Sequence, residues 1–179
     1  MAGVREAERI QRLVADAHVL RGPEATAADV AARLADHPFF HFIGTARLHE
    51  GVPQLEFAFG AEDGLNWRHL PQNLVADGVL AYLSACETAG DGRVFESEGW
   101  TIAASFQAAG YRHVIGLLGR PTDEDAMRIA VHVYELLVDP DGRIHPEHAA
   151  RALHTALQEA LAASPFRALA PPGVVHLGP

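Results

Sequence analysis

Cysteine, lysine and long apolar runs are scarce or absent in this sequence of 179 residues. The single cysteine, Cys86, excludes an internal disulfide and a cysteine-rich zinc site, and it is compatible with a reducing compartment. No stretch approaches the roughly 20 apolar residues of a membrane span. The chain is charged from Arg5 onward, whereas a secretory signal needs an apolar core. These absences predict a soluble, cytoplasmic protein with no membrane partner.

Acidic residues outnumber basic ones, 23 to 14, which gives a formal net charge of −9. Nucleic acid is not an expected partner, because phosphate binding needs a basic face. An acidic surface suits a cationic partner, but it is also an ordinary way to stay soluble, and the ordinary interpretation is favoured. The alanine- and arginine-rich composition is typical of a high-GC bacterial source.

The length predicts one domain over residues 1–179. A chain of this size buries roughly 70% of its unfolded surface, so it needs no disulfide or metal to fold. The 11 histidines show no metal-ligand spacing such as H-E-x-x-H. The sequence therefore predicts neither a metal nor another cofactor.

The spacing of apolar residues changes several times along the chain and predicts helices alternating with strands. Helices are predicted over residues 4–16, 26–34, 97–109 and 123–138 and from Pro146 onward. Thr26, followed three residues later by Asp29, resembles a helix N-cap signal. Strands are predicted over residues 17–20, 39–44, 54–60, 79–86, 113–118 and 174–179. This order predicts an α/β fold with a mostly parallel sheet covered on both faces. Chemistry gathers at the carboxyl ends of such strands, here at Cys86 and Thr45.

Cys86 follows a buried apolar strand, which is where a nucleophile could be displayed. An unperturbed thiol has a pKa near about 8.5, so catalysis would need a neighbouring histidine and backbone amides for the oxyanion. Buried lone cysteines are also common as small apolar fillers. From this residue alone, the filler interpretation is favoured and the nucleophile is the alternative.

The residues around Cys86 favour the nucleophile position more strongly. Residues 83–89 read L-S-A-C-E-T-A and resemble the cysteine motif of CHAT domains, the caspase- and separase-like peptidases of clan CD. Segments resembling the family occur in the same order at residues 23–42, 96–118 and 134–179. The resemblance implies a caspase-like three-layer α/β/α sandwich with a mostly parallel central sheet. It also implies, by default, a Cys–His endopeptidase.

The histidine motif departs from the family pattern. CHAT domains typically read H-F-x-x-H-G, in which the second histidine is catalytic, whereas residues 41–46 read H-F-I-G-T-A. The resemblance thus places Thr45 at the catalytic histidine position and Ala46 at the oxyanion-hole amide. A threonine hydroxyl cannot act as a general base near neutral pH, because its proton is too tightly held. The added methyl group of Ala46 is expected to restrict the backbone and crowd a substrate.

His49 is the best candidate for a replacement base, because it follows Thr45 by four residues on what is expected to be the same loop. A solvated loop residue is the simpler interpretation of His49 and is favoured. His41 is predicted to point under the sheet as a packed or hydrogen-bonded residue. Surface or strand-end positions are predicted for His69, His113 and His176.

Residues 118–123 correspond to the L-W-x-x-x-D stretch of the family. Gly119 replaces the tryptophan that helps wall the substrate cleft, while Asp123 matches, as does Glu98 in the acidic helix. In the family such carboxylates can help bind a basic side chain. The simpler interpretation makes Asp123 a helix N-cap, and this is favoured; Glu98 can equally be a first-turn residue stabilised by the helix dipole.

The residues leave three hypotheses open. In the first, the protein is a degenerate pseudo-peptidase that binds a peptide or protein partner with basic side chains. In the second, it is an active cysteine peptidase or acyl-transfer enzyme that uses Cys86 with a non-standard base such as His49. In the third, it is a structural subunit of a bacterial assembly, and a homodimer through a sheet edge is compatible with the fold. The first is favoured, because changes cluster at one site while the scaffold motifs remain.

Overall fold

The computed structural model describes residues 2–50, 52–70, 74–86, 102–118, 121–163 and 173–179. Its helices are α1 (Ala2–Leu13), α2 (Ala27–Leu34), α4 (Asp123–Leu137) and α5 (Ala149–Ala163), with a further helical stretch at residues 102–108. Its strands are β1 (Phe39–His49), β2 (Val52–Phe57), β3 (Gly60–Leu65), β4 (Leu80–Cys86), β5 (His113–Leu118) and β6 (Gly173–Leu177). Short 3₁₀ turns are η1 (Gly22–Glu24), η2 (Trp67–His69) and η3 (Pro146–His148).

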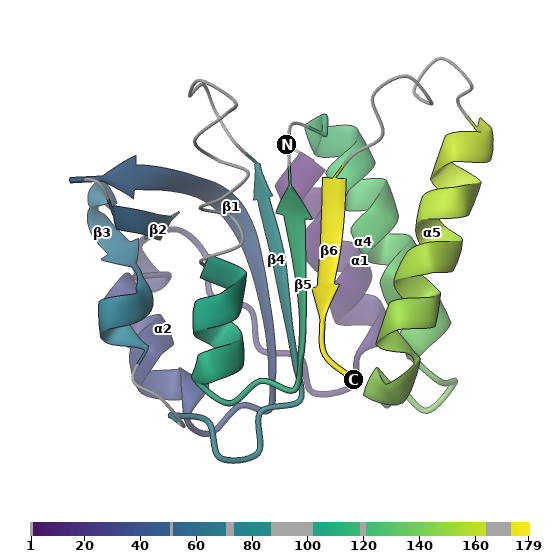
Figure 1. Cartoon of the computed structure of the whole chain (residues 1–179), viewed down its shortest axis with the longest axis horizontal. Coiled ribbons are helices and arrows are strands. Elements are labelled where there is room, and N and C mark those ends of the chain that lie inside the picture. The colour runs from purple at the N-terminus through teal and green to yellow at the C-terminus, as the bar shows by residue number, and fades with distance from the viewer. Residues whose placement is uncertain (1, 51, 71–73, 87–101, 119–120, 164–172) are drawn as a thin grey trace.

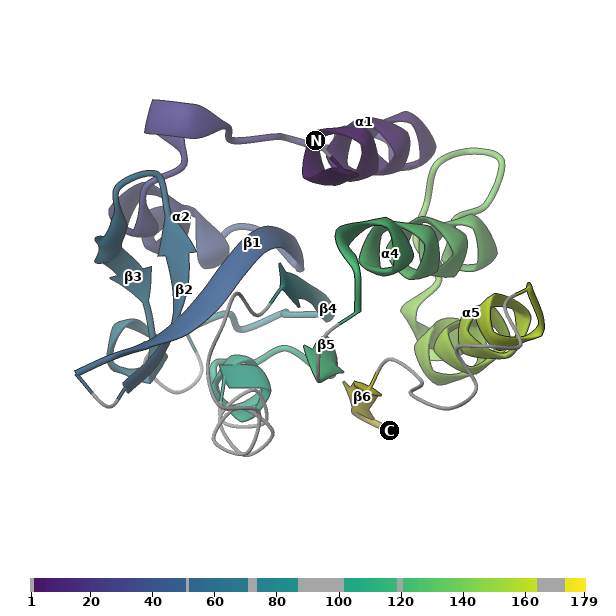
Figure 2. The ribbon, with the colours of Figure 1, turned by 90° about the horizontal axis from the view of Figure 1, so that it is seen from above.

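The described strands form a six-stranded sheet in the order β3-β2-β1-β4-β5-β6. At its centre β1, β4 and β5 run parallel, whereas β2, β3 and β6 pair antiparallel toward the two edges (Figure 1). Helices α1, α4 and α5 lie side by side on one face of the sheet (Figure 2). Helix α2 and residues 102–108 contribute to the core on the other face. The predicted α/β caspase-like sandwich is confirmed.

Alternate residues of the central strands fill the two cores. In β4, Leu80 and Tyr82 pack toward α1, α4 and α5, whereas Ala81 and Leu83 pack toward α2 and Phe106. A strand buried on both faces has no polar side, so its sequence reads as a continuous apolar run. The alternation also decides which residues of β1 and β4 share a face near the candidate site.

Local hydrogen bonds define where two helices begin. The Thr26 hydroxyl accepts a hydrogen bond from the Asp29 N–H at 3.1 Å, which confirms the predicted N-cap of α2. The Thr122 hydroxyl does the same for the Asp125 N–H at 3.2 Å at the start of α4. The prediction that Asp123 caps α4 is therefore wrong by one residue. Asp123 is the first helical residue, where the helix dipole still favours a carboxylate.

Strand predictions are less accurate than helix predictions toward the start of the chain. Residues 17–20 form no strand, and Leu20 instead packs against a core from an irregular segment. Strand β3 was not predicted, because its sequence GAEDGL lacks both alternation and β-branched residues. It is a strand because it pairs with β2, with Leu65 opposite Leu55 and both side chains buried.

Candidate functional site

The carboxyl-end halves of β1 and β4 bring the two predicted catalytic positions together. In the parallel register, Thr45 is the direct partner of Cys86, the last residue of β4. Neighbouring strands lie about 4.8 Å apart, so the backbones at these positions are adjacent. The side chain of Cys86 and residues 87–101 lie outside the described part of the chain. The backbone register alone places a threonine directly beside the cysteine.

Thr45 and Ala46 face opposite sides of the sheet. Thr45 is half-buried and shares a strand face with His41, by the alternation of β1. Ala46 is buried in the opposite core beside Leu55, its partner on β2. The methyl group of Ala46 therefore packs inward, away from the face of Thr45. Its position does not support the expected crowding of a substrate.

His49 is the last residue of β1 and does not lie on a loop, contrary to the expectation. It pairs with Val52 of β2 at the hairpin end of the strand. It lies four positions after Thr45 along the strand, a span of about 13 Å at about 3.3 Å per residue. The tip of β1 continues past the end of β4 toward the β2 side of the sheet (Figure 1). A general base must come within about 3 Å of the group it deprotonates, directly or through one water. The position of His49 therefore does not support it as the base for Cys86.

Asp123 lies at the same edge of the sheet, because α4 begins shortly after β5 ends (Figure 1). Its side chain is exposed in the first turn of the helix. The neighbouring Glu124 forms an ion pair with Arg5 of α1 at 2.6 Å, and Asp125 accepts a hydrogen bond from the Thr122 hydroxyl at 2.6 Å. The other two predicted cleft residues, Gly119 and Glu98, lie outside the described residues.

The strands and the helix that carry this site all lie within a match to a protein family. The family model for the CHAT domain matches residues 2–170, which include β1, β4 and the whole of α4. The chain belongs to the CHAT domain family. It is thus a caspase-like, peptidase-related module. A search of curated proteins gave no match.

A buried polar network lies beneath the CHAT-domain site, on the same face of β1 as Thr45. His41 Nε2 lies 3.0 Å from a carboxylate oxygen of Glu6 on α1, and His41 Nδ1 lies 3.1 Å from the hydroxyl of Tyr134 on α4. The imidazole also stacks on Tyr82 of β4, with ring centroids 4.9 Å apart. The prediction that His41 is a packed, hydrogen-bonded histidine is confirmed. Both of its ring nitrogens are engaged, and it lies four residues before Thr45.

Glu6 is the member of this network that sequence reasoning missed. It is only 2% exposed and lies between Ala2 and Ile10 at four-residue spacing, on the face of α1 that packs inward. A glutamate within an apolar helical stripe is the signal that could have revealed it. Burial, and secondarily the charge of Glu6, raises the pKa of both Tyr82 and Tyr134, so both phenols stay protonated.

The Tyr82 hydroxyl is fully buried and, within the described part of the chain, has no hydrogen-bond partner. We therefore expect Tyr82→Phe to raise the free energy of unfolding by about 1 kcal/mol, because it removes an unsatisfied polar group. Tyr134→Phe is the matched control and should lower it by about 1 kcal/mol, because it breaks the bond to His41. Urea denaturation measures both; a Tyr82→Phe variant less stable than the parent would contradict the assignment.

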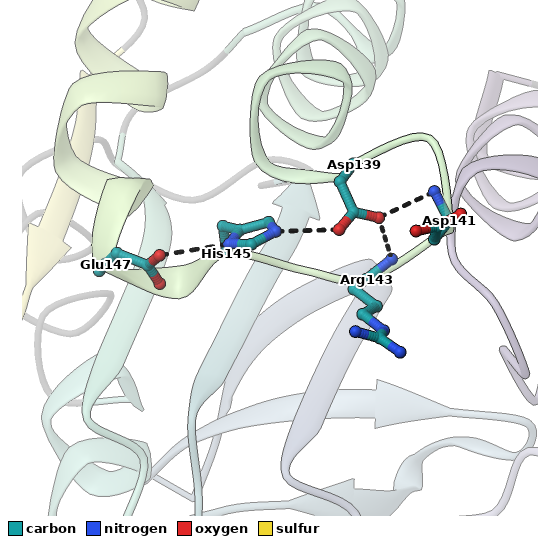
Figure 3. Close-up of polar contacts among 5 residues, drawn as sticks. All are labelled: Asp139, Asp141, Arg143, His145 and Glu147. Carbon is teal, nitrogen blue, oxygen red and sulfur yellow. Dashed lines mark hydrogen bonds and ion pairs between the residues drawn. The ribbon is translucent and has the colours of Figure 1, made fainter.

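Two other polar clusters of this CHAT domain lie outside the β1–β4 site. One is the turn after α4, where His145 bridges Asp139 at 3.1 Å and Glu147 at 3.3 Å (Figure 3). Asp139 also accepts hydrogen bonds from the backbone N–H groups of Asp141 and Arg143, so its carboxylate organises the turn. The other is a pocket of about 320 Å³ lined entirely by residues of α4 and α5, in which His132 lies 2.9 Å from Glu159.

Neither cluster is a ready-made metal site. Across the described ranges, no group of three or more His, Cys, Asp or Glu side chains is arranged to hold a metal ion. None of the helices in that part of the chain combines the length and apolar character needed to cross a membrane.

Proposed function

We propose that this CHAT domain is a pseudo-peptidase that binds a peptide or protein partner with basic side chains at the carboxyl-end edge of its sheet. The observation that carries the proposal is the pairing of Thr45 with Cys86 in the β1–β4 register. The family resemblance assigns the catalytic histidine to this position. A threonine hydroxyl there cannot take a proton from a thiol near neutral pH.

The two histidines of β1 do not offer a replacement from their positions. His41 lies four residues before Thr45 and His49 four residues after it, so each is about 13 Å away along the strand. His41 is further held by Glu6 and Tyr134. These positions support loss of the Cys–His pair over its relocation within β1.

The charge at the α4 end of the site supports a basic partner. Glu124 is paired with Arg5 and Asp125 with the Thr122 hydroxyl, whereas within the described chain the exposed carboxylate of Asp123 has no such partner. The net charge of −9 adds a long-range attraction for cations. A basic side chain bound at Asp123 would form a partly exposed ion pair whose strength falls with added salt.

Binding of fluorescent arginine-containing peptides, measured by anisotropy at two salt concentrations, tests the proposal. We expect Asp123→Asn to weaken binding by about three- to tenfold, consistent with one lost ion pair of about 1 kcal/mol. Cys86→Ala and the matched surface variant Asp36→Asn should bind as the parent does. Peptide cleavage that disappears in Cys86→Ala would instead establish an active hydrolase. Absence of salt-dependent binding would leave a structural role as the better explanation.

A further inference from the structure

We propose that His113, His176 and Gly178 form an acid-sensitive latch that fastens the edge strand β6 to β5. This latch lies at the amino end of β5, whereas Cys86 lies at the carboxyl end of the neighbouring parallel strand β4. The inference concerns the C-terminal strand and does not depend on the proposed binding function.

The latch rests on a hydrogen bond between two imidazoles. His113 Nδ1 lies 3.1 Å from His176 Nε2, with ring centroids 5.4 Å apart and ring planes inclined by 22°. His113 is the first residue of β5 and is 7% exposed, while His176 is half-buried on β6. One of the two facing nitrogens must donate a proton and the other must accept it. The contact joins β6 to β5 through side chains, in addition to the backbone hydrogen bonds between the two strands.

Gly178 closes over this contact. A Cβ atom built at this position would come within 2.7 Å of the Arg112 carbonyl oxygen and 2.9 Å of His113 Nδ1. Its φ of +152° is also a conformation that residues with a side chain rarely adopt. The chain therefore passes directly against the imidazole pair, and only glycine permits this approach. Movement of the pair must displace the backbone that follows β6.

Protonation of His113 and His176 destabilises this contact. Burial lowers the pKa of His113, the neighbouring charge of Arg112 lowers it further, and the carboxylate of Glu147 on η3 opposes the shift. Burial and the nearby His113 lower the pKa of His176. Because both pKa values are lower in the folded state, the pair contributes full stability above about pH 6.5, and that contribution is lost as the pH falls through the folded values.

The number of bound protons determines when the latch opens. A first additional proton can be shared, because an imidazolium N–H can donate to the remaining neutral ring. A second additional proton places two N–H groups face to face across 3.1 Å. This breaks the hydrogen bond between the imidazoles and brings two positive charges together. Opening is therefore expected to start at the Gly178 end, where the pair lies, and to proceed along β6.

Hydrogen exchange measured by mass spectrometry on the intact chain tests the latch. His176→Gln keeps a side chain that can hydrogen-bond but does not titrate. Relative to this variant at each pH, we expect exchange protection of residues 173–179 in the parent protein to fall by about tenfold between about pH 7.5 and about pH 5. Protection of β4 should stay constant over the same range. The exposed His154→Gln variant is the matched control and should reproduce the parent profile.

Gly178→Ala supplies a second, independent test. It should reduce the protection of residues 173–179 already at about pH 7.5, where the histidines are neutral. The proposal is overturned if the parent and His176→Gln have the same pH profile at β6. It is also overturned if β6 and β4 lose protection together, because that result reports global acid unfolding.

Discussion

Replacing Thr45 by histidine is expected to lower the midpoint of the pH profile for Cys86 alkylation by about one to two pH units. The reason is the β1–β4 register, which places residue 45 directly beside residue 86. An unassisted thiol has a pKa of about 8.5, and an adjacent imidazolium stabilises the thiolate. The mass shift of the intact protein reports the modification without ambiguity, because the chain has a single cysteine.

The midpoint is more informative than the rate at one pH. A thiolate of lower pKa is more abundant but intrinsically less nucleophilic, so the two effects partly cancel near neutral pH. Thr45→Asn is the matched control, because it adds a polar side chain that carries no titratable proton, and it should leave the midpoint unchanged. His49→Ala should also leave it unchanged. A parent midpoint well below about 8.5 that rises in His49→Ala would favour the active-enzyme hypothesis instead.

Replacing His41 by alanine is expected to lower the free energy of unfolding by about 3 kcal/mol. The substitution leaves the carboxylate of Glu6, which is 2% exposed, without its imidazole partner. It also removes the bond to Tyr134 and the stacking contact with Tyr82. Because Glu6 lies on α1, His41 on β1 and Tyr134 on α4, the loss should loosen the helical layer that covers this face of the sheet. Denaturant unfolding followed by circular dichroism measures the change.

Arg5→Ala is the matched control for His41→Ala. Arg5 is also a member of an ion pair between α1 and α4, but both partners are about half exposed, at 55% and 46%. An exposed pair contributes less than about 1 kcal/mol, because water screens it and its side chains lose conformational freedom. Combining His41→Ala with Glu6→Gln should recover part of the lost stability, since no buried charge then remains unpaired. Equal losses in His41→Ala and Arg5→Ala would show that Glu6 is not effectively buried.

Features that depend on neighbours in sequence were predictable. The Thr26 cap of α2 is confirmed because the capping hydroxyl and the N–H that it satisfies lie three residues apart. The central strands were recognisable because burial on both faces produces continuous apolar runs. His41 is also confirmed as a packed, hydrogen-bonded histidine, although its partners Glu6 and Tyr134 are distant in sequence and were not predicted.

Features that depend on partners distant in sequence were not predictable. Strand β3 has no strand-like pattern of its own and is set by its pairing with β2. Residues 17–20 have the apolar character of a strand but no neighbouring strand to bond, so they form none. The burial of Glu6 depends on contacts 35 residues away, with His41, which no local pattern contains.

By itself, the sequence determined the α/β class, the CHAT resemblance and the identity of the residues at positions 45 and 86, because motifs and periodicity are local properties of the chain. Only the tertiary structure decided that Thr45 stands directly beside Cys86, that His49 lies about 13 Å farther along the same strand, and that the methyl group of Ala46 packs into a core. Strand register and side-chain face arise from pairing between segments that are far apart in the chain. That pairing minimises buried unsatisfied backbone groups and exposed apolar surface over the whole domain, and not over any one segment.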